Sequence, residues 1–335
     1  MTDVLPFPAV IAALDAAGEE TRLRILALLS EAELTVTELT AILGQSQPRV
    51  SRHLKLLVEA GLVDRHREGA WAFFRRADTG PAAALTGAVL TAVDPADGVM
   101  ATDRRRLAEV RAERGQQAAQ YFARHAAEWD RIRSAHVPEA RVEAAILDLL
   151  GDARIETMLD IGTGTGRMLE LIAPRTSRAV GLDVSPAMLA VARANVERAG
   201  LRQVQLRQGD VYALPAGETG FSLIVLHQVL HFLDDPGRAV REAARLLGPG
   251  GRLLVADLAP HTDEKMRNEF NHRRLGFAAE EVAGLMRDAG LQGVRVRALK
   301  PIAGEGDVLT VTLWLGRDAR VQTDAPFSSS LSEVA

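Results

Sequence analysis

The sequence predicts a two-domain α/β protein, in which a mostly helical N-terminal domain precedes a domain built on a mainly parallel sheet of seven strands. The chain has 335 residues, roughly the length of two ordinary domains. Residues 8–93 show short amphipathic helices and one hairpin, whereas apolar strands alternate with helices from residue 140 onwards. The breaker run 94–98 separates the two patterns.

These patterns predict a first domain over residues 1–98, a helical linker over 99–137, a second domain over 138–316 and a disordered tail over 317–335. The chain has no cysteine, which excludes disulfides, thiolate metal sites and a cysteine nucleophile. Its net charge is −4, so contact with nucleic acid requires a local basic patch. The sequence shows no signal peptide or membrane span, and we expect a soluble, cytoplasmic protein without a metal.

The helices of the first domain have recognisable ends. A short amphipathic helix over Thr35–Leu43 is closed by Gly44, which favours a left-handed helix end. Ser46 is expected to cap the next helix, which ends at Gly61. A further apolar helix is expected over about Pro81–Val93.

The helix that follows Ser46 has a polar outer surface. Its buried stripe is Val50, Leu54 and Leu57, which leaves the following side chains facing outward or sideways: Gln47, Arg49, Ser51, Arg52, His53 and Lys55. Arginine and glutamine read base edges, while serine and lysine suit phosphates. Arg67 lies on the hairpin that follows, and residues 49–76 contain seven Lys or Arg against three acids. This order of elements predicts a winged helix-turn-helix that binds double-stranded DNA.

The first 95 or so residues resemble ArsR-type transcriptional repressors, most clearly in Glu20–Leu26, Leu39–Lys55 and Glu59–Val63. The resemblance implies a homodimer, built through the first and last helices, that inserts residues 47–55 into the major groove of an operator. Metal-sensing members carry cysteines where this chain has Thr35 and Thr37, so thiolate sensing is excluded. The expected wing tip has Ala70 where the family often places a basic residue.

The second domain is expected to hold a parallel sheet that ends in an antiparallel pair of strands. The predicted strands are 157–161, 179–184, 204–208, 221–226, 251–257, 294–299 and 308–315, with helices such as 186–199 and 237–247 between them.

Glycines and acidic residues follow the first three of these strands. Gly162, Gly164 and Gly166 come after the first strand, with Asp160 before them and Thr163 among them. Asp183 and Asp210 end the next two strands. Each feature alone is common in a tight turn or a helix cap. Together they predict a ligand crevice at the carboxyl ends of the strands, with Asp183 placed to accept from ribose hydroxyls.

The second half resembles class I S-adenosylmethionine-dependent methyltransferases in Leu159–Gly166, Gly181–Leu189, Gly209–Val211 and Leu246–Leu253. The resemblance implies S-adenosylmethionine or S-adenosylhomocysteine as the cofactor. It places the methionine part at the glycine loop and the ribose at Asp183. It puts Val184 and Met188 beside the adenine, which Asp210 and Val211 cap. Tyr121, Phe122 and Trp129 match the family's N-terminal lid.

No residue is predicted to be catalytic, although His227 and His231 are expected at the mouth of the cofactor site. Two hypotheses remain open. In the first, the domain senses the adenosyl ligand and sets operator affinity. In the second, it methylates a small molecule, and the helix-turn-helix serves autoregulation. Methyl transfer from a sulfonium needs chiefly positioning, so an absent catalytic signature favours sensing only slightly.

Overall fold

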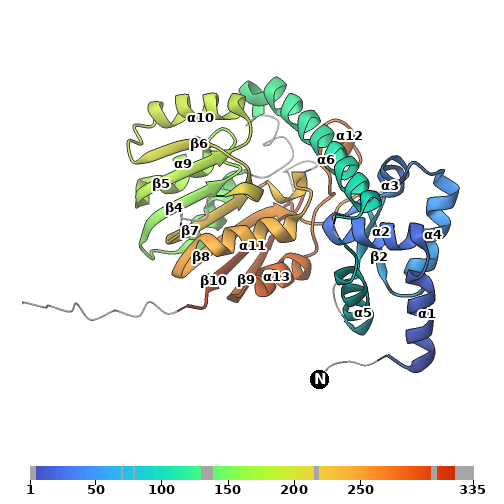
Figure 1. The fold of residues 1–335 in the computed structure, drawn as a ribbon. Coiled ribbons are helices and arrows are strands. Elements are labelled where there is room, and N and C mark those ends of the chain that lie inside the picture. The colour runs from blue at the N-terminus through green and yellow to red at the C-terminus, as the bar shows by residue number, and fades with distance from the viewer. Residues whose placement is uncertain are drawn as a thin grey trace, which may run out of the picture. The chain divides into compact units, whose positions relative to one another are not determined.

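The computed structural model describes residues 5–68, 71–77, 80–94, 96–129, 139–214, 219–302 and 308–320. The chain forms two compact units (Figure 1). The first contains residues 1–125, 231–236 and 260–276, and the second contains the remainder. Ala70 at the expected wing tip and residues 321–335 of the expected tail lie outside the described residues.

The first unit confirms the predicted order of helix, turn, basic helix and hairpin. Its small antiparallel sheet has the strand order β1-β3-β2. Ile25, Leu39 and Leu54 are among the side chains of its apolar core. The elements are α1 (Phe7–Ala17), α2 (Glu20–Glu31), β1 (Leu34–Thr35), α3 (Val36–Leu43), α4 (Gln47–Glu59), β2 (Val63–Glu68), β3 (Trp71–Arg76), α5 (Gly80–Thr91), α6 (Gly98–His125) and α12 (Lys265–Asn268).

The predicted helix end at Gly44 is confirmed, whereas the predicted cap at Ser46 is not. Thr35 and Glu38 form a capping box at the start of α3. Gly44 ends that helix with φ of 65°. The predicted cap at Ser46 is wrong in its chemistry, because its side chain makes no capping hydrogen bond. Pro48 has no N–H to offer, and Arg49 N donates instead to the Ser46 carbonyl oxygen at 3.0 Å.

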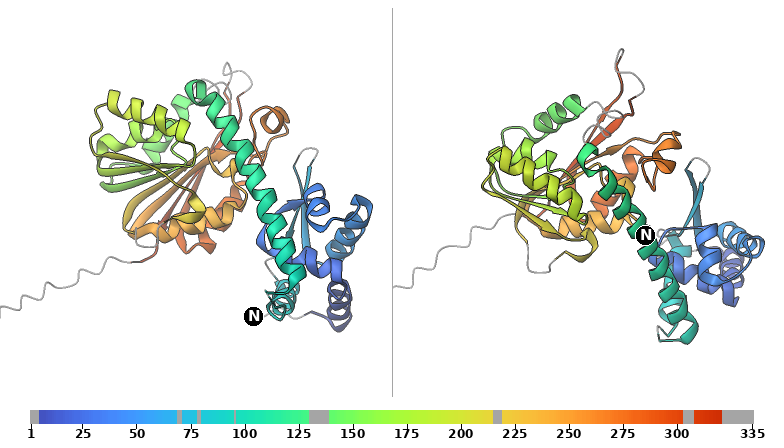
Figure 2. Two further views of the ribbon diagram at one scale, coloured as in Figure 1. Left: turned by 45° about the horizontal axis from the view of Figure 1, so that its top comes forward. Right: turned by 90° about the horizontal axis from the view of Figure 1, so that it is seen from above.

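Helix α6 is a single helix of 28 residues, visible along its whole length in Figure 2. It begins where the sequence predicts the boundary, but it packs with the first unit. The Arg24 guanidinium donates to both carboxylate oxygens of Asp103, at 2.7 and 2.8 Å. Leu107 is buried in the core of the first unit. Residues predicted as linker therefore form part of this unit's core.

The second unit confirms the predicted seven-stranded sheet, with the order β6-β5-β4-β7-β8-β10-β9. The strands from β6 to β8 run parallel, and β10 is antiparallel to both of its neighbours. The elements are α8 (Glu139–Leu150), β4 (Ile155–Ile161), α9 (Arg167–Ile172), β5 (Thr176–Asp183), α10 (Pro186–Arg198), β6 (Val204–Gln208), β7 (Phe221–His227), α11 (Pro236–Leu246), β8 (Leu247–Leu258), α13 (Ala279–Asp288), β9 (Leu291–Leu299) and β10 (Val311–Asp318).

The strand order reverses at β4. From β4 the chain proceeds to β5 and β6 on one side, and it then returns to β7 on the other side. In an open parallel sheet, such a reversal leaves a crevice at the carboxyl ends of the two strands. The predicted glycine loop follows β4 at this point.

Candidate ligand cleft and nucleic-acid interface

Three glycines give the loop after β4 a backbone that other residues rarely adopt. Gly162, Gly164 and Gly166 have φ values of 70°, 54° and 86°. A Cβ at Gly162 would lie only 2.5 Å from Val229 Cγ2, so this position admits no side chain. A Cβ at Gly164 would lie 3.8 Å from Trp129 Nε1, which places the expected lid residue Trp129 beside the glycine loop.

Asp160 and Thr163 hold this loop from inside the protein. Asp160 is only 1% exposed, and its Oδ2 accepts from Thr163 Oγ1 at 2.6 Å. The N–H groups of Gly162 and Thr163 donate to Leu182 O at 2.8 and 2.9 Å, which ties the loop to β5. These bonds give Asp160 and Thr163 a positioning role, and their contact with a cofactor stays a prediction.

Asp183, at the end of β5, bridges the glycine loop and the start of α10. Its Oδ2 accepts from Gly164 N and its Oδ1 accepts from Ser185 N, both at 2.8 Å. Burial raises the pKa of the Asp183 carboxyl, although the backbone donors oppose this shift. A carboxylate has about four acceptor sites. Asp183 therefore keeps capacity for hydroxyl donors, as a ribose-binding residue requires.

The residues expected around an adenine lie at the ends of β5 and β6. Asp210 is exposed, and its Oδ1 accepts from Tyr212 N at 2.9 Å. Val184 is 52% exposed, whereas Met188 and Val211 are enclosed. The contact of these four residues with a cofactor stays a prediction.

At the end of β7, His227 is 7% exposed and is followed by Gln228, which sequence reasoning missed. Gln228 has φ of 57°. Nothing in the sequence indicates this left-handed backbone, because glutamine does not favour it.

Tyr121 lies on α6 in the first unit, with its ring centroid 4.7 Å from that of His125. Burial raises the pKa of Tyr121 to about 12. Its cofactor contact stays a prediction.

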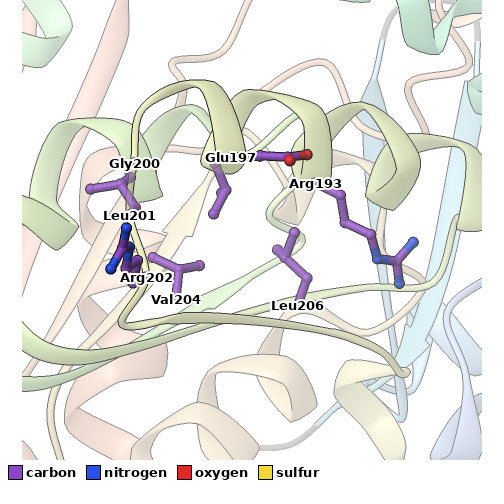
Figure 3. A pocket seen from close by; sticks show the side chains of 8 residues that line it. Arg193, Glu197, Gly200, Leu201, Arg202, Val204 and Leu206 are labelled. Atoms are coloured by element: carbon purple, nitrogen blue, oxygen red, sulfur yellow. The ribbon is translucent and has the colours of Figure 1, made fainter.

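A cavity of about 460 Å³ lies elsewhere, between α10 and β6 (Figure 3). Its lining is Arg193, Val196, Glu197, Gly200, Leu201, Arg202, Val204 and Leu206. None of these side chains was predicted to contact a cofactor. Its lining includes neither the glycine loop nor Asp183.

The outer face of α4 presents most of the predicted DNA-binding residues to solvent. The exposed set is Gln47, Arg49, Ser51, Arg52 and Lys55. Val50, Leu54 and Leu57 are buried on the opposite side, as predicted. The arrangement provides bidentate donors for base edges beside groups suited to phosphates.

His53 departs from this outward-facing set. Only 12% of its side chain is exposed, and Nδ1 lies 3.5 Å from Glu19 Oε2. Burial lowers the pKa of His53. This packing against the start of α2 gives His53 a structural role. Arg67 lies opposite Ala72 in the hairpin of β2 and β3, and its side chain falls outside the described residues.

No group of three or more histidine, cysteine, aspartate or glutamate side chains suited to a metal occurs among the described residues. Within the same part of the chain, no helix is long and apolar enough to cross a membrane.

Two protein families match the chain. Residues 19–65 match the bacterial regulatory protein, arsR family, and residues 159–255 match the methyltransferase domain family. Methyltransferase YcgJ of Bacillus subtilis is 31% identical over 115 residues, or 34% of this chain and 46% of its own. A 37.1 kDa protein in transposon TN4556 of Streptomyces fradiae is 26% identical over 205 residues, which cover 57% of this chain and 59% of that protein. The chain spans about half the length of these curated relatives.

Among solved structures, N-methyltransferase NodS from Bradyrhizobium japonicum, in complex with S-adenosylhomocysteine, shares the fold. Its TM-score is 0.50 at 23% identity, over 60% of this chain and 98% of that chain. The chain thus combines an ArsR-type helix-turn-helix region with a class I methyltransferase fold.

Proposed function

We propose that the protein is a homodimeric, cytoplasmic transcriptional regulator that binds operator DNA through α4. In this proposal its methyltransferase-like domain binds S-adenosylmethionine or S-adenosylhomocysteine, and occupancy changes operator affinity. One observation carries the regulatory part. Residues 231–236 and 260–276 begin within four residues of the ends of β7 and β8 in the chain, and they pack as part of the first unit, which contains α4. Loops at the carboxyl ends of the sheet therefore belong to the first unit, which we call the DNA-binding unit.

Residues 260–276 make charged contacts with the helix-turn-helix and hairpin elements of the same unit. Arg274 forms an ion pair with Glu33, which lies between α2 and β1, and their side chains are only 13% and 10% exposed. The Arg267 guanidinium lies 5.5 Å from the ring centroid of Phe73, on the hairpin strand β3. Because both pairs are largely enclosed, displacing this segment would disturb the hairpin and its support.

The first segment contacts α6 through aromatic rings. Phe232, in η4 (Leu230–Phe232), has its ring centroid 4.9 Å from that of Phe122 and 5.0 Å from that of His272. Helix α6 then leads through η1 (Ala126–Glu128) to Trp129 beside Gly164. The segment predicted as a helical linker therefore has contacts near both of its ends. These contacts support a coupling between ligand binding and operator binding, which allostery requires.

Removing the Glu33–Arg274 pair should uncouple ligand from operator. In a Glu33→Gln and Arg274→Gln double variant both charges disappear, so neither is left buried alone. We expect unchanged affinity for S-adenosylhomocysteine, while the ligand-induced change in operator affinity shrinks to within about twofold. Calorimetry measures the first quantity, and operator titration with and without ligand measures the second.

An exposed ion pair of the same unit provides the matched control. Arg104 Nε lies 2.9 Å from Glu31 Oε1, and the two side chains are 45% and 38% exposed. Replacing both with glutamine should leave the ligand response intact, because exposed pairs contribute little. A full ligand response in the Glu33 and Arg274 double variant would remove this contact from the coupling route.

A second candidate function is methyl transfer to a small molecule. It is favoured by the glycine loop together with His227, a buried group that could take a proton from an acceptor. The chain lacks the Asn-Pro-Pro-Tyr type of motif found in amino-group nucleic-acid methyltransferases, which argues against DNA as the acceptor. Release of S-adenosylhomocysteine in the presence of an acceptor would establish this activity.

The affinity for S-adenosylhomocysteine should depend on pH through Asp183. The ionised carboxylate is the stronger acceptor for ribose hydroxyls, so affinity is full above the pKa and declines as pH falls through it. Because burial raises this pKa, the decline should begin at a higher pH than an ordinary aspartate would give. Calorimetric titrations at decreasing pH would show the decline. The same pH dependence in Asp183→Asn would assign it to another group.

A further inference from the structure

Gln228 combines two unfavourable features immediately after β7. Its φ of 57° lies in the left-handed region, which among the described non-glycine residues only Asn271 shares. The residue is only 8% exposed, and Nε2 has no hydrogen-bond partner within the described part of the chain. Backbone strain and unpaired buried donors are both destabilising, and they concentrate at functional sites.

Neighbouring groups on β8 hold Gln228 in this conformation. Gln228 N donates to Ala256 O at 2.8 Å. The fully buried Asp257 accepts from Leu230 N with Oδ2 at 2.9 Å, and from Leu258 N with Oδ1 at 2.7 Å. The backbone of the turn is thus fixed on both sides of Gln228.

The order of strands gives Gln228 a definite place relative to the other candidate residues. Along the sheet edge, Asp210 follows β6, Asp183 ends β5, the glycine loop follows β4, and Gln228 follows β7. Val229, the next residue, packs directly on Gly162. Adjacent strands are about 4.8 Å apart. A ligand with its adenine at Asp210 and its ribose at Asp183 would extend its remaining part across β4 toward β7.

We propose that Gln228 Nε2 donates a hydrogen bond to the carboxylate at the amino-acid end of an adenosyl ligand. This inference rests on the proposed binding of S-adenosylmethionine or S-adenosylhomocysteine. A carboxylate is the charged acceptor on that end of the molecule. A buried amide donor forms a stronger hydrogen bond with a charged acceptor than with a neutral one. Gln228 thereby selects adenosyl amino acids over nucleosides that lack the amino-acid end.

Two ligands distinguish this contact from a structural effect. S-adenosylhomocysteine carries the amino-acid end, whereas 5′-methylthioadenosine keeps the adenosine and the sulfur but lacks that end. In Gln228→Leu, we expect calorimetric affinity for S-adenosylhomocysteine to fall about tenfold or more, the loss typical of a hydrogen bond to a charged group. Affinity for 5′-methylthioadenosine should stay within about twofold. Gln228→Glu, which is closer in shape, should weaken S-adenosylhomocysteine further by repelling its carboxylate.

Gln208 supplies the matched control, because it ends β6 and its Nε2 donates to Val184 O at 3.2 Å. Gln208→Leu should not discriminate between the two ligands. Equal losses for both ligands in Gln228→Leu, or no loss for either, would overturn the inference while leaving the adenosyl pocket in place. A wild-type chain that binds neither ligand would overturn the pocket together with the inference.

Discussion

Replacing Asp183 with alanine should weaken S-adenosylhomocysteine binding by about 100-fold or more. Each hydrogen bond between the ionised carboxylate and a ribose hydroxyl contributes roughly 1.5–3 kcal/mol. The substitution also removes the acceptor for Gly164 N and Ser185 N, which position the loop and the start of α10. Ligand contact and loop geometry are therefore lost together. Isothermal titration calorimetry measures the effect.

Asp183→Asn provides the control because it keeps one acceptor oxygen and removes the charge. We expect its affinity to lie between those of the wild type and the alanine variant. Operator binding without ligand should persist in both variants, which would show that the DNA-binding unit remains folded. Wild-type affinity for S-adenosylhomocysteine in the alanine variant would refute the assignment of the pocket.

Replacing Arg52 with alanine should weaken binding to the cognate operator by ~1–3 kcal/mol and relax base preference at one position of each half-site. Arg52 is exposed on α4 and lies opposite the buried stripe of that helix. In a dimer, two such helices would read half-sites about one turn apart, ~10–10.5 bp, in an inverted repeat. Gel-shift titrations against the cognate site and single-base variants measure both effects.

Lys55→Ala separates phosphate contact from base reading. Lys55 is also exposed on α4, and its loss should weaken all sequences about equally while lowering the salt dependence. Unchanged operator affinity in both Arg49→Ala and Arg52→Ala would remove α4 from the interface.

Features that depend on local chemistry were predictable from the sequence. Gly44 ends α3 in a left-handed conformation, and the three glycines after β4 adopt positive φ values, because these backbone shapes favour glycine. The alternation of strands and helices likewise predicted the parallel sheet, and the short loop between the predicted strands 294–299 and 308–315 predicted their antiparallel pairing. Ser46 shows the limit of such reasoning, since Pro48 removes one donor that a cap would satisfy.

Features that depend on distant contacts were not predictable. Nothing in residues 260–276 indicates that Arg274 pairs with Glu33, because the two lie 241 positions apart in the chain. His53 occurs at helical spacing with outward residues, yet its contact with Glu19 turns it toward α2. Gln228 owes its left-handed backbone to Ala256 and Asp257 on the adjacent strand. In each case tertiary contacts, rather than local propensity, determine the conformation.

The central claim is that occupancy of the adenosyl pocket changes operator affinity. The most direct measurement is operator titration of the wild-type protein without ligand, and then with saturating S-adenosylmethionine or S-adenosylhomocysteine. We expect at least one ligand to shift operator affinity by about 5- to 150-fold, which corresponds to ~1–3 kcal/mol of coupling. By linkage, operator DNA should change the affinity for that ligand by the same factor. Three superimposable titration curves would contradict the claim and leave a methyltransferase domain merely fused to a DNA-binding domain.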